Sequence, residues 1–125
     1  MYCNTTLTNG VKSVSLDKNT PALAVSGIAD PQSFHKTLER AGINISETIT
    51  FLDHHDYVQK DINIILEKAE KDNIDIIVTT EKDLVKLKNY SFDGFELLGL
   101  EIKFQVEHQS EQELFNIIER KLSIV

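Results

Sequence analysis

The chain has 125 residues, of which 41% are hydrophobic and 26% charged, and a formal net charge of −7. These values are typical of one soluble globular domain. The 13 basic residues are scattered and outnumbered by 20 acidic ones, which argues against a nucleic-acid surface. A single cysteine, Cys3, excludes an internal disulfide, and no apolar run approaches the roughly 20 residues of a membrane span.

Residues 1–20 are polar and are expected to form a lead-in or an interdomain arm, in which VKSVSL is a candidate edge strand or hairpin arm. From Pro21 onward, apolar runs alternate with segments of helical period, as in βαβ units. The expected strands lie near residues 22–28, 45–52, 74–79 and 95–105.

The helical segments between these strands carry start and stop signals. An amphipathic helix is expected through VQKDINIILEKAEKD and a short one through EKDLVKL. The expected N-cap residues are Asp30, Thr80 and, for a last helix over SEQELFNIIERKL, Ser110. Gly42 suits the left-handed position that ends the first helix.

Together these elements predict a three-layer, Rossmann-like α/β domain over residues 21–125, with a mainly parallel sheet of about four strands and helices on both faces. The first and third strands are the most apolar and are therefore expected to be central, in the order second, first, third, fourth. Ligands of such sheets bind at the carboxyl ends of the strands. The segments SGIADP, DHHDY and TTEKD each follow a strand directly, so this edge is the expected site.

The DHHDY segment has three interpretations. It can be a solvated loop whose aspartates bind local backbone amides, which is the most common case. It can contribute metal ligands, but adjacent residues rarely reach one ion and no further Cys or His pair at ligand spacing supports this. It can also hold an acid–base pair, a histidine oriented by a neighbouring carboxylate. Spacing alone does not choose among them. The phosphoesterases named for a DHH triplet need upstream aspartates that are missing here.

The other two segments lack a phosphate-binding fingerprint. SGIADP has one glycine instead of the G-x-G-x-x-G pattern, and the chain has no G-x-x-x-x-G-K-[ST]. Lys82 of TTEKD is a candidate phosphate neighbour, although a capped helix start with a surface lysine explains the same letters. From the residues alone, a binding module is favoured over an enzyme.

Three segments in this order, GIADPQSFHKTLERAGI, FLDHHDY and TTEKDLVKL, resemble the C-terminal part of tetraacyldisaccharide 4′-kinase, the lipid A 4′-kinase. The similarity spans about residues 22–105, which corresponds to roughly the last third of a family member. It implies an enzyme that uses ATP and Mg²⁺ to phosphorylate the 4′-hydroxyl of tetraacyldisaccharide 1-phosphate, giving lipid IVA at the cytoplasmic face of the inner membrane. The family's P-loop and catalytic aspartate lie in an N-terminal domain, which would be the partner of this chain.

The resemblance also implies roles for single residues. His54 matches the histidine that the family places beside the catalytic aspartate, and Asp53 would orient it. Gly27, Glu81, Lys82 and Asp83 are candidates for the neighbourhood of the substrate or a phosphate. No metal ligand and no cofactor bound to this chain alone are expected.

Positions 52 and 58 depart from the family's pattern. Leu52 replaces the family's usual proline, and Val58 stands where a Thr or Ser would cap the next helix. His55 is expected to be exposed and replaceable, because the family accepts other residues there. The sequence therefore predicts a C-terminal kinase domain that is inactive alone. The alternative is a stand-alone α/β module that binds a ligand or a protein without catalysis.

Overall fold

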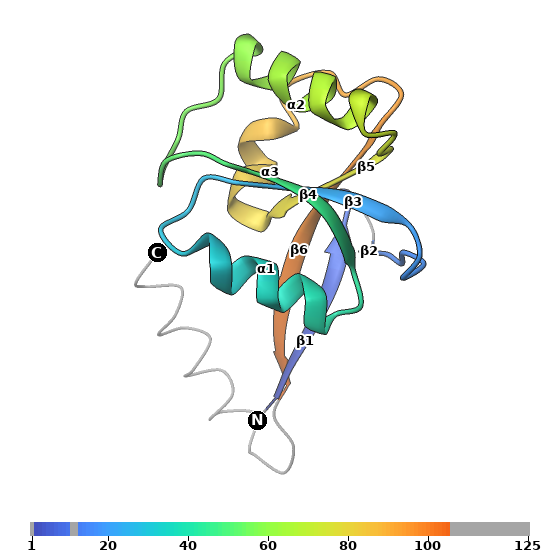
Figure 1. The fold of residues 1–125 in the computed structure, drawn as a ribbon. Helices are drawn as coiled ribbons and strands as arrows, with labels where there is room; N and C mark the ends of the chain where they lie inside the picture. Colours follow the sequence, from blue (N-terminus) through green and yellow to red (C-terminus); the bar gives the residue numbers. More distant parts are fainter. Residues whose placement is uncertain (1, 11–12, 106–125) are drawn as a thin grey trace.

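The computed structural model describes residues 2–10 and 13–105, which form one mixed α/β sheet domain (Figure 1). The elements in chain order are β1 (Tyr2–Thr8), β2 (Ser13–Val14), β3 (Pro21–Ser26), α1 (Pro31–Arg40), β4 (Asn44–Thr50), α2 (Gln59–Lys71), β5 (Ile76–Thr80), α3 (Glu81–Leu87) and β6 (Glu96–Gln105). The expected last helix, with Ser110 as its cap, lies outside the described residues.

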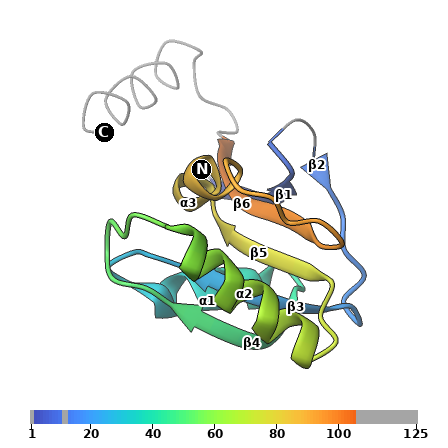
Figure 2. The same cartoon turned by 90° about the horizontal axis from the view of Figure 1, so that it is seen from above.

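The sheet has six strands in the order β2-β1-β6-β5-β3-β4 (Figure 2). Its parallel part, β4-β3-β5-β6, confirms the predicted order of the four expected strands. The sheet has two strands more than the four or so expected, because residues expected as a lead-in add β1 and β2. The strand β1 pairs antiparallel with β6, from Tyr2 opposite Gln105 to Thr8 opposite Gly99, and β2 is the edge strand expected in VKSVSL.

Helices cover both faces of the sheet, as predicted (Figure 1). On one face, α1 buries Phe34 and Leu38 against alternate residues of the strands. On the other face, α2 and α3 bury a second apolar cluster. The helical members of that cluster are Ile62, Ile65, Ala69 and Leu87. The central strands are apolar on both sides for this reason.

The helix termini follow the sequence signals. The Asp30 side chain accepts a hydrogen bond from the Ser33 N–H at 3.1 Å, and the Thr80 hydroxyl accepts one from the Asp83 N–H at 3.0 Å. Gly42 follows α1 with φ of +84°, the left-handed conformation that favours glycine. The two N-caps fix where the helices begin, α3 directly after the carboxyl end of β5 and α1 after the short loop that follows β3.

The start of α2 lacks a side-chain cap, because the N-cap residue is Val58. Val58→Ser should raise the free energy of unfolding by about 1 kcal/mol, since a hydroxyl there can accept a hydrogen bond from the first turn. Urea unfolding followed by circular dichroism measures the change. Val85→Ser, at an equally exposed position inside α3, is the control and should give no gain. Equal gains at both positions would contradict the capping explanation.

Candidate functional site

The loop that follows β4 is bound to the end of β3. The Phe51 N–H donates to the Ser26 carbonyl oxygen at 2.7 Å, and the His54 N–H donates to the Gly27 carbonyl oxygen at 3.1 Å. A Cβ atom at Gly27 would stand 3.1 Å from the Leu52 carbonyl oxygen and 3.2 Å from the Tyr57 hydroxyl. Gly27 is therefore needed for close approach of the two loops, which brings SGIADP and DHHDY together at the carboxyl edge.

His54 is the most exposed ring of this loop, with 68% of its side chain accessible. Its Nδ1 lies 3.0 Å from the Lys82 Nζ, and its Nε2 lies 3.7 Å from Asp53 Oδ2. Its φ is +60°, which is uncommon for a residue other than glycine. Such a backbone persists only where surrounding contacts hold it, and such residues cluster at functional sites. The structure thus brings His54, Asp53 and Lys82 together, as a geometry that could serve acid–base chemistry.

Asp83, the residue after Lys82, is buried, with only 1% of its surface exposed. Its Oδ2 accepts hydrogen bonds from the Gly27 N–H at 3.1 Å and from the Thr80 hydroxyl at 2.6 Å. One carboxylate therefore joins the loop after β3 to the start of α3. A buried carboxylate with these partners is placed to hold the loops in position. That Gly27 and Asp83 lie near the substrate or a phosphate stays a prediction.

Tyr57 is buried, and its hydroxyl faces the same carboxylate. Its carbonyl oxygen accepts a hydrogen bond from the Tyr90 hydroxyl at 2.6 Å. Burial, followed by the negative charge of Asp83, raises the pKa of Tyr57 well above its usual value. Tyr57 therefore stays protonated at physiological pH and acts as a packing residue under the loop.

The expectation that His55 is exposed was wrong, because only 26% of its side chain is accessible. Its ring stacks on Phe51 with centroids 4.6 Å apart, and its Nε2 lies 2.8 Å from Asp61 Oδ2. The hydrogen bond with His55 and that from the Val58 N–H hold the pKa of the Asp61 carboxyl below its usual range. The two adjacent rings thus have different partners, since His55 ties the loop to α2 whereas His54 faces outward.

Sequence reasoning missed two residues that hold this loop. Asp61 stands three residues after Val58, which is the spacing of a capping box, and this could have drawn attention to it. Lys86 is the last residue of the T-E-K-D-x-x-K segment. Its Nζ donates to the His55 carbonyl oxygen at 3.0 Å and lies 4.0 Å from Asp56 Oδ1. Both residues anchor the loop from helices on one side of the sheet.

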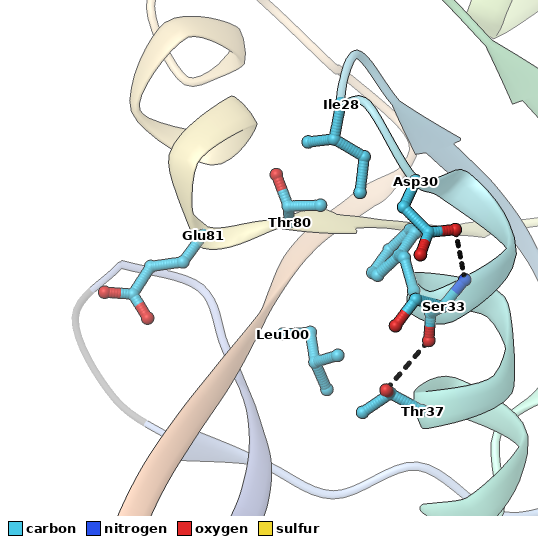
Figure 3. Close-up of a pocket in the computed structure, with 8 residues that line it drawn as sticks. Ile28, Asp30, Ser33, Thr37, Thr80, Glu81 and Leu100 are labelled. Carbon is cyan, nitrogen blue, oxygen red and sulfur yellow. Dashed lines mark hydrogen bonds between the residues drawn. The ribbon is translucent and has the colours of Figure 1, made fainter. Parts of the chain in front are cut away.

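Glu81 is placed away from His54, in a pocket of about 440 Å³ between α1 and the start of α3 (Figure 3). Ile28, Phe34 and Leu100 give the pocket an apolar floor. Its polar lining is Asp30, Ser33, Thr37, Thr80 and Glu81. Two of the four phosphate candidates, Glu81 and Lys82, therefore lie on different sides of the start of α3, although they are adjacent in sequence.

Within residues 2–10 and 13–105, no group of three or more His, Cys, Asp or Glu side chains is arranged to hold a metal ion. No helix in those ranges is long and apolar enough to cross a lipid bilayer.

Comparison with known proteins identifies relatives that match most of this chain. The chain is 40% identical over 121 residues to a tetraacyldisaccharide 4′-kinase of Desulfatibacillum aliphaticivorans, covering 94% of this chain and 32% of that protein. It is 34% identical over 103 residues to one of Bradyrhizobium sp. (strain ORS 278), covering 82% and 30%. The chain thus spans about a third of the length of these relatives.

A solved structure and a family-wide sequence model agree with these relatives. The crystal structure of the "apo" form of LpxK from Aquifex aeolicus in complex with ATP superposes with a TM-score of 0.59 at 27% identity. The match covers 94% of this chain and 35% of that one. The sequence model of tetraacyldisaccharide-1-P 4′-kinase matches residues 3–123. With the three motifs gathered at one edge of the sheet, the chain belongs to the tetraacyldisaccharide-1-P 4′-kinase family.

Proposed function

We propose that this chain serves as the C-terminal domain, about the last third, of a tetraacyldisaccharide 4′-kinase. That enzyme transfers the γ-phosphate of ATP to the 4′-hydroxyl of tetraacyldisaccharide 1-phosphate and forms lipid IVA. The observation that carries the proposal is His54, an exposed imidazole held at the carboxyl edge by its backbone bond to Gly27 and by Lys82. A ring fixed in this way is suited to meet a group that comes from another domain.

ATP and Mg²⁺ are assigned to the N-terminal domain of the enzyme. The residues of the edge do not fit a triphosphate, because the Gly27 N–H is already bonded to Asp83. The first turns of α1 and α3 are likewise capped by the side chains of Asp30 and Thr80. No step of nucleotide binding is therefore assigned to this chain. The P-loop and the catalytic aspartate come from the N-terminal domain.

The contribution of this chain is to position a carboxylate. Phosphoryl transfer depends mainly on the placement of the reacting groups and on electrostatic stabilisation. In the proposed enzyme, the partner's aspartate accepts the proton of the sugar hydroxyl, and His54 Nε2 holds that aspartate in place. Asp53 Oδ2 lies 3.7 Å from the same nitrogen, beyond hydrogen-bond distance, so its negative charge orients the ring while the Nε2–H is left for the partner's aspartate. Because the acceptor is a lipid precursor, we place the assembled enzyme at the cytoplasmic face of the inner membrane.

A chimera tests the proposal. The matching segment of the Desulfatibacillum aliphaticivorans relative is replaced by this chain, and transfer of labelled phosphate from ATP to tetraacyldisaccharide 1-phosphate is measured. The chimera should be active, whereas the isolated chain should show no transfer and no heat of MgATP binding in the micromolar range. A folded but inactive chimera, or tight ATP binding by the isolated chain, would contradict the proposal and favour a binding module.

A further inference from the structure

Lys82 contacts one of the two ring nitrogens of His54. Lys82 Nζ lies 3.0 Å from His54 Nδ1. An ammonium group has three donors and no acceptor, so the nitrogen that faces it must be the unprotonated acceptor of the imidazole. The ring proton then sits on Nε2, the nitrogen that faces Asp53. The contact selects one of the two neutral tautomers.

The geometry of this contact is fixed by hydrogen bonds that hold the backbone on both sides of it. Asp83 bonds the Gly27 N–H, and the Gly27 carbonyl oxygen holds the His54 N–H. The same Asp83 carboxylate bonds the Thr80 hydroxyl at the start of α3, two residues before Lys82. Both partners of the Lys82–His54 contact are therefore attached to one buried carboxylate, although they lie 28 positions apart in the chain.

We propose that Lys82 is a positioning residue that sets the tautomer of His54, so that the ring presents an Nε2–H to a carboxylate. Its importance for catalysis rests on the proposed function, because that carboxylate is the catalytic aspartate of the N-terminal domain. The tautomer itself does not, since it is a property of this chain alone. A direct contact between Lys82 and a substrate phosphate is the competing explanation.

Nitrogen NMR of the isolated, ¹⁵N-labelled chain tests the tautomer. At about pH 8.5, two units above the ordinary histidine pKa, the ring nitrogens of His54 should show a protonated Nε2 and an unprotonated Nδ1. Lys82→Arg keeps a donor and should keep this pattern. Lys82→Met should mix the two tautomers. Lys82→Glu places an acceptor opposite Nδ1 and should move the proton to that nitrogen.

His55 is the internal control in every spectrum. Its Nε2 is bonded to Asp61, away from Lys82, so its ring signals should stay constant across the Lys82 variants. A His54 pattern that is the same in Lys82→Met and Lys82→Glu as in the unaltered chain overturns the inference. Changes at both histidines would also overturn it, because they would report a general disturbance of the loop.

Kinetics of the chimera separate positioning from substrate contact. Lys82→Met should lower kcat by about 10- to 100-fold with little change in KM, the scale for losing a residue that fixes the tautomer of a functional histidine. Lys82→Arg should restore most of kcat. A raised KM for either substrate with an unchanged kcat would overturn the catalytic part of the inference. An inactive chimera would count against the proposed function, while the NMR result would still decide the tautomer.

Discussion

His54→Asn in the chimera is expected to lower kcat by on the order of 10²–10³, the usual scale for losing an acid–base group. Asparagine tolerates the left-handed backbone of this position, where φ is +60°, so the loop should keep its conformation. The side chain is 68% exposed, and the free energy of unfolding should therefore change by less than about 0.5 kcal/mol. Steady-state kinetics and urea unfolding measure the two effects separately.

The neighbouring histidine is the matched control. His55→Ala removes the ring that stacks on Phe51 and bonds Asp61, so it should lower the free energy of unfolding by about 1–2 kcal/mol. Its effect on kcat should be smaller than that of His54→Asn. A larger loss of kcat at position 55, or a stability loss at position 54 alone, would show that the roles of the two rings are reversed.

Asp83→Ala is expected to lower the free energy of unfolding of the isolated chain by about 2–4 kcal/mol. The change leaves the buried Gly27 N–H and the Thr80 hydroxyl without their acceptor, and each unpaired group costs about 1–3 kcal/mol. Because Asp83 joins two of the three loops, the chimera should also lose activity at temperatures where it stays folded. Urea unfolding gives the stability, and the kinase assay gives the activity.

Glu81→Ala controls for the loss of a carboxylate in the first turn of α3. Glu81 is exposed and lines the pocket beside α1, so its removal should cost less than about 1 kcal/mol, the size of a helix-dipole interaction. Similar losses for the two variants would mean that Asp83 acts only through the helix terminus. In that case the bond to Gly27 would have no measurable effect on stability.

The sequence by itself determined the parallel part of the sheet and the edge at which the three motifs meet. Apolar runs and helical periods depend on neighbours a few positions apart, so the strands and the caps at Asp30 and Thr80 could be predicted from the sequence. The strand order could be predicted because the most apolar runs occupy the centre of a parallel sheet. The three motifs follow strands whose carboxyl ends share one edge, which is why their meeting could be predicted. Their order and spacing also indicated the family.

The pairing of strand β1 and the positions of single loop residues were decided only by the tertiary structure. Pairing of β1 with β6 depends on backbone hydrogen bonds between segments about a hundred residues apart, and the polar sequence of β1 gives no apolar pattern for it. In the loop, side-chain direction depends on each residue's φ and ψ. The left-handed backbone at His54 turns that ring outward, whereas His55 packs on Phe51. No regular period encodes such a reversal, so only the folded contacts distinguish the two histidines.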